Sequence, residues 1–324
     1  MVDRVSVRVP ASSANIGPGF DAFSVALEKP HIHLTAEKLE GEMGVVLEAR
    51  GPFSRQVPLN PVQNAAARAF QSLVLERGLR CGVKIVIEAG IPVAKGLGAS
   101  GAEAVGAVVA GEKLLGLSLS EEDRIRIAAS AEPGFHADNV IASLLGGFNI
   151  IDSSREGLIF LNVKPPENIG LVVLVPKFEK KSTEEARKAI TQTPTLSEYV
   201  QALSRASLIS AALALGKVDL LLRLIPFDPF IERVRANAGL YGPGYSWERL
   251  LEEKEKLLRE FEVALCISGS GPSRLLIYDS RKGLERVEQA VEYLSDRLER
   301  MAGGLETVIY TKPSPGGAEI TALH

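Results

Sequence analysis

A glycine-rich segment, residues 91–101, constrains the fold of this chain more than any other stretch. The residues before it, 81–88, alternate branched apolar and polar side chains, which is typical of a β-strand. The residues after it, 99–115, place Ala, Val and Leu at helical spacing. The glycines carry no side chain that would keep an anion away from the backbone N–H groups at the start of that helix. The pattern therefore predicts a strand–loop–helix unit that binds phosphate.

The same glycines also match Gly-x-Gly-x-x-Gly, the fingerprint of dinucleotide-binding folds. Such a site needs its first glycine directly after the strand and an acidic residue on the next strand, about 20 positions later. Here residues 91–95 separate the strand from the first glycine, and residues 116–123 are typical of a turn followed by a helix cap. The Walker pattern with its terminal Gly-Lys-Ser/Thr is also absent. We therefore favour an ATP site over a Rossmann dehydrogenase.

The composition limits the remaining possibilities. The chain has 324 residues, of which 46% are hydrophobic, so it is long enough for two domains. A formal net charge of −3 and the lack of a basic run argue against nucleic-acid partners. No apolar run reaches the roughly 20 residues of a membrane span, and no signal-peptide core is present. With only Cys81 and Cys266, we expect a cytoplasmic protein whose partners are small molecules, without nucleic acid or membrane.

The order of predicted elements is typical of the α+β class, because strands and helices mix irregularly. The expected strands are residues 5–9, 23–36, 45–48, 81–88, 147–151, 158–163 and 170–175. The expected helices are residues 62–77, 99–115, 137–145, 183–190, 196–215 and 247–260, followed by a strand–helix–strand alternation from residue 263. The polar, proline-bearing residues 164–168 are the best candidate boundary. They divide the chain into an amino-terminal domain, 1–165, and a carboxy-terminal domain, 166–324.

Two further glycine-bearing segments combine small residues with hydroxyls. Residues 10–21 (PASSANIGPGFD) follow the first predicted strand, and residues 266–273 (CISGSGPS) lie between two strand-like runs near the far end. This composition lets the backbone approach a ligand closely. A tight hairpin is the alternative for residues 268–273.

Together these segments resemble the GHMP superfamily of small-molecule kinases, and within it the homoserine kinase family. The segment 10–21 is similar to that family's opening motif almost residue for residue, whereas the sugar and mevalonate kinases open on patterns around Gly-Glu-His. The resemblance covers nearly the whole chain in the expected order, through residues 92–102, 136–140, 146–148, 183–187, 231–236 and 268–273.

The resemblance implies an amino-terminal nucleotide-binding domain of the ribosomal-S5-like kind, a ferredoxin-like carboxy-terminal domain, and an active site between them. It implies transfer of the γ-phosphoryl group of ATP to the side-chain hydroxyl of L-homoserine, with Mg²⁺ bridging the phosphate oxygens. This reaction belongs to threonine biosynthesis. A homodimer is a further expectation from the family.

The resemblance also implies roles for individual residues. Nucleotide binding falls to Asn64, Pro92, Val93, Ala94, Lys95, Gly96, Leu97, Gly98, Ala99, Ser100, Gly101 and Ala102. Substrate binding falls to Asn15, Asp21, His136, Asp138, Thr183, Arg187, Arg235 and Gly269. The metal ligands would be Ser100 and Glu132, and the catalytic groups Ser100, Asp138 and Asn139. The arginines suit a zwitterionic substrate, because a guanidinium binds a carboxylate through two parallel hydrogen bonds.

Several positions depart from the family pattern and leave alternatives open. Ala99 stands where the family usually has a serine, so Ser100 is the only loop hydroxyl for magnesium. The interval from Glu132 to Asn139 is short, which leaves the role of Glu132 as a metal ligand open. Arg233 competes with Arg235 for the substrate carboxylate, and we prefer Arg235 on register. Lys95 would either add a cation near the phosphates or lie solvated in an exposed loop.

The catalytic base is a separate question. Many superfamily members have an aspartate where this chain has Asn139, and an amide cannot accept a proton as a general base. We therefore expect direct proton transfer to a phosphate oxygen, or assistance from Asp138. Two other functions are weighed against homoserine phosphorylation: another small-alcohol kinase, such as a shikimate or mevalonate kinase, and a non-catalytic nucleotide sensor on the same fold.

Overall fold

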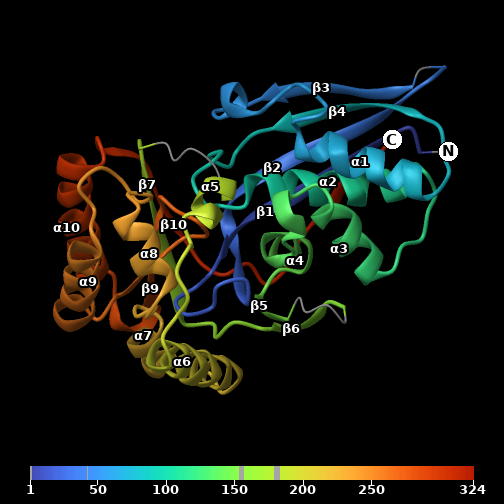
Figure 1. Ribbon diagram of the computed structural model, residues 1–324. Coiled ribbons are helices and arrows are strands. Elements are labelled where there is room, and N and C mark those ends of the chain that lie inside the picture. The colour runs from blue at the N-terminus through green and yellow to red at the C-terminus, as the bar shows by residue number, and fades with distance from the viewer. Residues whose placement is uncertain (1, 42, 153–156, 179–182) are drawn as a thin grey trace.

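Two β-sheets with helices packed on them make up the computed structural model (Figure 1). The structure describes residues 2–41, 43–152, 157–178 and 183–324. Over these residues the strands form a seven-stranded sheet from the first half of the chain and a four-stranded sheet from the second half, with one exception given below. No helix in the described ranges is both long and apolar enough to span a bilayer.

The first sheet is antiparallel except for the pair β3–β4. Its strands are β1 (Arg4–Ala14), β2 (Phe23–Leu39), β3 (Gly44–Arg50), β4 (Gly82–Glu88), β5 (Phe148–Asp152), β6 (Ile159–Val163) and β11 (Glu319–Leu323). Val5, Val7 and Val9 on β1 are fully buried, whereas the residues between them are at least partly exposed. This alternation places one face of the sheet on the core and the other toward solvent.

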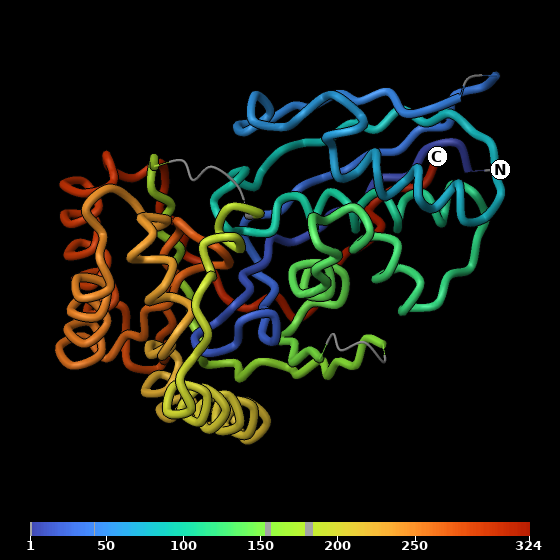
Figure 2. Tube along the Cα trace, viewed as in Figure 1, coloured from blue at the N-terminus to red at the C-terminus, as the bar shows by residue number. Residues whose placement is uncertain are grey.

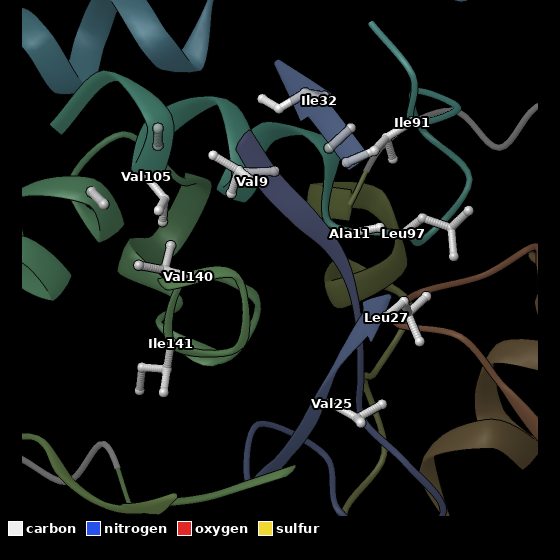
Figure 3. Close-up of a cluster of buried hydrophobic side chains, with 14 of the residues drawn as sticks. Val9, Ala11, Val25, Leu27, Ile32, Ile91, Leu97, Val105, Val140 and Ile141 are labelled. Carbon is white, nitrogen blue, oxygen red and sulfur yellow. The ribbon is translucent and has the colours of Figure 1, made fainter. Parts of the chain in front are cut away.

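The core face of the first sheet is covered by α1 (Ala65–Glu76), α2 (Ala99–Leu114) and α4 (Asp138–Leu145), and α3 (Glu121–Ala129) packs against these helices. Figure 3 shows Val9 of β1 beside Val105 of α2, with Val140 of α4 near Val105, and Ala11 of β1 beside Leu97; all belong to one buried cluster. Helix α2 is buried on nearly every side, because its many alanines and glycines let the sheet and the flanking helices approach closely. The core thereby fixes the helix that begins directly after the glycine-rich loop.

The second sheet is antiparallel, in the order β10-β7-β9-β8. Its strands are β7 (Ile169–Pro176), β8 (Ala264–Ile267), β9 (Arg274–Asp279) and β10 (Leu305–Thr311). All residues of β7 are buried, which explains its continuous apolar sequence. Helices α6 (Leu196–Ala214) and α7 (Val218–Leu224) pack toward one face, and α8 (Ile231–Asn237), α9 (Trp247–Lys256) and α10 (Glu285–Met301) toward the other. This strand order confirms the predicted ferredoxin-like arrangement.

The last strand of the chain belongs to the first sheet. β11 pairs with β1 there, although it lies within residues 166–324 of the predicted carboxy-terminal domain. The backbone N–H of Asp3 also donates to His324 O, and Figure 2 shows the two ends of the chain close together. The predicted boundary at residue 165 separates the two sheets only up to β10. A strand that returns to an edge over a long distance leaves no local signal in the sequence.

The helices match the sequence prediction with three differences. Helices α7 and α8 were not predicted, and the helix predicted for 247–260 ends at Lys256 and continues as a π-helical turn, η3 (Leu257–Phe261). Short 3₁₀ turns are η1 (Ser54–Gln56), η2 (Pro133–Phe135) and η4 (Ser280–Lys282). Helix α5 (Thr183–Lys188) lies between the two halves of the molecule in Figure 1.

Candidate active site

The three glycine-bearing segments of the sequence meet at one place between the sheets. The hydroxyl of Ser268 lies 2.7 Å from the carbonyl oxygen of Gly96 and 2.8 Å from the hydroxyl of Ser13. A Cβ atom at Gly96 would lie 2.2 Å from the carbonyl oxygen of Ser268, so only glycine allows this approach. The backbone N–H of Gly269 donates to Ala14 O at 2.9 Å. The segment 268–273 therefore closes on the other two segments.

The phosphate loop has the backbone that its glycines predict. Ala94, Gly96 and Gly98 have φ values of 59°, 79° and 66°, in the left-handed region. Gly98 is the N-cap of α2 and offers no side chain to the first N–H groups of that helix, which therefore remain available to an anion. A Cβ atom at Gly98 would lie 2.1 Å from Ser12 Oγ. Both the left-handed backbone and the packing therefore favour glycine at this position.

A single pocket gathers most of the predicted residues. Those that line it are Asn15, Asp21, Val93, Ala94, Gly96, Leu97, Gly98, Ala99, Ser100, Glu132, His136, Asp138, Asn139, Arg187, Arg235 and Gly269. Phe20, Pro133 and Ser270 also line it and were not predicted. Phe20 is an aromatic residue within the opening motif, which is the signal that could have identified it.

The remaining predicted residues do not line the pocket. Asn64 is buried as the N-cap of α1, where it accepts from the N–H of Ala67 and donates to Glu103. Gly101 and Ala102 are buried in α2, and Pro92 is buried beside the loop. The side chain of Thr183 lies outside the described residues.

Both alternatives for Lys95 are corrected. Its side chain is neither solvated nor directed at the pocket; it is buried, and the ammonium donates to the carbonyl oxygens of Pro176, Lys177 and Phe178 at 2.9 to 3.1 Å. The reason is that the second sheet brings three carbonyl groups next to the loop, and an ammonium has three N–H donors.

The acidic end of the pocket holds Ser100, Glu132 and Asp138. The hydroxyl of Ser100 donates to Glu132 Oε2 at 2.9 Å, while the buried Glu132 Oε1 has no hydrogen-bond partner. Burial raises the pKa of Glu132 to about 7, and burial also raises the pKa of Asp138. The short interval after Glu132 thus does not keep it from Ser100.

These groups fit a magnesium ion bound together with a nucleotide. The described residues contain no cluster of three or more His, Cys, Asp or Glu side chains suited to a metal. Mg²⁺ commonly takes only one or two protein oxygens and completes its shell with phosphates and water. The Ser100 hydroxyl and the unpaired Glu132 Oε1 are oxygens of that kind.

Asn139 is held in a fixed orientation. The Ser12 hydroxyl donates to Asn139 Oδ1 at 2.9 Å, and the Ser143 hydroxyl lies 3.3 Å from Ser12 Oγ. With its oxygen engaged, the amide directs Nδ2 toward Asp138 Oδ1, 3.3 Å away. Asn139 therefore presents a donor on this side of the pocket, and no acceptor for a proton.

The basic end of the pocket holds Arg187 and Arg235. Arg187 Nη2 lies 2.7 and 2.8 Å from the two carboxylate oxygens of Asp21 and 3.2 Å from His136 Nδ1. Both guanidinium groups lie over the ring of Phe20, at 5.0 and 5.1 Å from its centroid. Phe20 therefore sets the spacing of the two cations through stacking.

Arg235 differs from Arg187 in lacking a counter-charge. It is only 2% exposed, and its described hydrogen bonds go to two carbonyl oxygens, Ala186 at 3.3 Å and Gly269 at 3.5 Å, with no carboxylate within ion-pair distance among the described residues. Arg233, the other candidate, forms an ion pair with Glu198 of α6 and does not line the pocket. The structure thus supports Arg235 over Arg233, and a buried, uncompensated guanidinium suits an anionic ligand.

The sequence is similar to those of known proteins. Residues 61–147 match the family described as GHMP kinases N terminal domain. The homoserine kinase of Thermoplasma acidophilum is 31% identical over 316 residues, covering 93% of this chain and 96% of that protein. The homoserine kinase of Methanopyrus kandleri is 33% identical over 295 residues, covering 90% and 92%.

Solved structures match over nearly the whole chain. The homoserine kinase from Cytophaga hutchinsonii gives a TM-score of 0.84 at 24% identity, covering 99% of this chain and 98% of that one. The mevalonate diphosphate decarboxylase from Staphylococcus aureus gives a TM-score of 0.74 at 15% identity, covering 99% of both chains. These matches confirm the predicted two-domain architecture.

Proposed function

The chain belongs to the homoserine kinase family of the GHMP kinases, and on that premise we propose that it transfers the γ-phosphoryl group of ATP to the side-chain hydroxyl of L-homoserine. The product is O-phospho-L-homoserine, in threonine biosynthesis. The observation that carries the proposal is a pocket with an open helix N-terminus at one end and, at the other, the buried Arg235 without a carboxylate partner among the described residues. The first suits a phosphate chain and the second a carboxylate.

In this proposal the acceptor is positioned by charge. Arg235 binds the carboxylate with Arg187, and the Asp21 carboxylate then has capacity for the ammonium group. His136 and Asn15 complete the polar wall around the amino acid. Such fixed geometry places the hydroxyl near the phosphorus, which is the main contribution that a kinase makes to phosphoryl transfer.

The nucleotide is held by the loop and the first turn of α2. The backbone N–H groups from Gly96 to Ser100 would donate hydrogen bonds to the phosphates and stabilise the negative charge that develops during transfer. Ser100 and Glu132 would hold Mg²⁺, which when bound neutralises phosphate charge and orients the phosphoryl group. Glu132 Oε1, buried without a hydrogen-bond partner, supports this assignment.

We propose that the hydroxyl proton passes directly to a phosphate oxygen or is assisted by Asp138. Asn139 Nδ2 donates a hydrogen bond on the same wall and supplies no basic site. Burial raises the pKa of Asp138, which makes this carboxylate a better proton acceptor than an exposed one. Asp138 is the first residue of α4, lines the pocket and is only 7% exposed.

We also propose a cytoplasmic location and a homodimer. The two cysteines are both free, as expected for a reducing compartment. Light scattering after size-exclusion chromatography would measure the mass of the particle and so test the dimer.

An ADP-release assay over homoserine, shikimate, mevalonate and galactose tests the function. We expect ADP release with homoserine at a rate well above the other three alcohols, since none of those has an ammonium group beside a carboxylate. Release with shikimate or mevalonate alone would show a different small-alcohol kinase. Nucleotide binding without ADP release for any of the four acceptors would indicate a non-catalytic nucleotide sensor.

A further inference from the structure

Lys95 lies in the phosphate loop but holds the loop to the opposite half of the molecule. Its ammonium donates to the carbonyl oxygens of Pro176 at the end of β7 and of Lys177 and Phe178 just beyond it. The same ammonium forms an ion pair with Glu306 Oε2 of β10 at 3.4 Å. All of these partners belong to the second sheet or to the chain that leaves it.

A second connection runs parallel to the first. Gln56 of η1 accepts from the N–H of Val93 at 3.0 Å, and its Nε2 lies 3.4 Å from Glu306 Oε1. Glu306 thus joins both ends of residues 93–95 to the second sheet. We call Lys95, Gln56, Glu306 and the three carbonyl groups the strap.

The strap ties together the parts that carry the two substrates. The loop at one end carries the predicted phosphate contacts, and the second sheet at the other end carries α8, whose Arg235 lines the same pocket. A change in the distance between the loop and the second sheet would move the γ-phosphorus relative to the acceptor hydroxyl.

We propose that Lys95 is a positioning residue that fixes the phosphate loop against the second sheet, on which α8 carries the acceptor-binding Arg235. The proposal rests on the proposed kinase function. Lys95 does not line the pocket, so it would act through the loop. Its loss should therefore lower kcat more than it raises the KM of either substrate, because each half keeps its own contacts.

The variants Lys95→Met and Lys95→Arg test this. Met keeps the unbranched stem and removes the ammonium, so we expect kcat to fall about 100-fold, with both KM values within about threefold of wild type. Arg keeps the charge and should recover kcat to within about tenfold. Lys164→Met is the control, since that lysine is 77% exposed and paired only with Glu167 in the described contacts; its kcat should match wild type.

Two results would overturn the proposal. One is a folded Lys95→Met enzyme with kcat within twofold of wild type, even if its melting temperature falls. The other is a large rise in one KM with kcat unchanged, since that would make Lys95 a binding group for one substrate. Should Lys95→Met fail to fold, Glu306→Gln decides: kcat about fivefold lower, with unchanged KM values, supports the strap, and unchanged kcat overturns it.

Hydrogen exchange separates this proposal from the proposed function. Wild-type protein without homoserine-dependent ADP release would count against the function alone. Exchange of the amides in residues 93–98 needs no substrate, and we expect it to be about tenfold faster in Lys95→Met. Equal exchange in the two proteins would overturn the strap whatever the activity.

Discussion

The two ends of the pocket carry excess charge of opposite sign. At the acidic end, Asp138 is buried and Glu132 is half-buried, and loss of hydration raises the pKa of both. At the basic end, Arg235 is buried with no carboxylate partner among the described residues, and Arg187 has only Asp21. Each end thus lacks the charge that one substrate would bring: a metal ion with its nucleotide at one, a carboxylate at the other.

The ends also differ in how they are built. The nucleotide end consists mainly of backbone in one contiguous loop, with glycines required by close approach to Ser12 and Ser268. The acceptor end consists of side chains from the opening motif, α5 and α8. Substitutions should therefore affect the acceptor end more severely, since a lost side chain removes the contact itself.

The largest effect is expected for Arg235→Met. Removing one partner of a buried charge pair should raise the KM for homoserine about 100-fold or more, with the KM for ATP within about threefold. The melting temperature should not fall, because the guanidinium has no carboxylate to lose in the free protein. Steady-state kinetics and thermal unfolding measure these effects. Arg233→Met is the matched control, and an equal rise in KM there would contradict the assignment.

Glu132→Gln and Ser100→Ala probe the acidic end. We expect kcat/KM for ATP to fall about 30-fold for the first and about tenfold for the second, with a higher magnesium concentration needed for half-maximal activity. The KM for homoserine should remain unchanged. Titration of activity with magnesium measures this, and Glu122→Gln on the exposed side of α3 is the control. An unchanged magnesium requirement would exclude both residues as ligands.

Asp138→Asn should have a smaller effect, about tenfold on kcat, if the proton moves directly to phosphate. A dedicated general base contributes typically 10²- to 10⁴-fold, roughly, so the size of the loss distinguishes the two routes. Single-turnover kinetics together with binding of homoserine and an ATP analogue give the answer. Loss of all turnover with both affinities intact would rule out direct transfer.

The contrast between the ends also explains what the sequence could predict. The loop is contiguous, and its glycines, its position before α2 and its left-handed backbone all follow from local rules. The register of Arg235 against Arg233 followed from the family resemblance. The direction of a side chain does not follow from local rules: Lys95 and Asn64 were assigned to the nucleotide, yet Lys95 points to the second sheet and Asn64 caps α1.

Contacts between segments far apart in the chain could not be predicted from the sequence either. The return of β11 to β1 and the position of Phe20 beneath both arginines depend on segments far apart in the chain. Neither is visible in hydrophobic periodicity, which reports burial but not the partner.

The smallest effect, and the sharpest test of excess negative charge at the acidic end, is expected at Glu103. This side chain lies behind the pocket on α2, 5% exposed, and accepts from Asn64 Nδ2 at 3.3 Å. Burial, with the nearby Glu132 charge, raises its pKa from 4.5 to about 8. A raised carboxyl pKa contributes stability that is present below pH 4.5 and is lost as the pH rises through about 8.

Glu103→Gln removes that pH-dependent loss, because a neutral amide has no proton to release. The melting temperature should match wild type near pH 5 and exceed it by about 2 °C or more at pH 9, while kcat stays within about twofold, since Glu103 does not line the pocket. Thermal unfolding of both proteins across this range measures the difference. A difference in melting temperature that is constant with pH, or that shrinks as the pH rises, would contradict the prediction. It would show that ionisation of Glu103 does not destabilise the fold, and that the excess negative charge is limited to the residues that line the pocket.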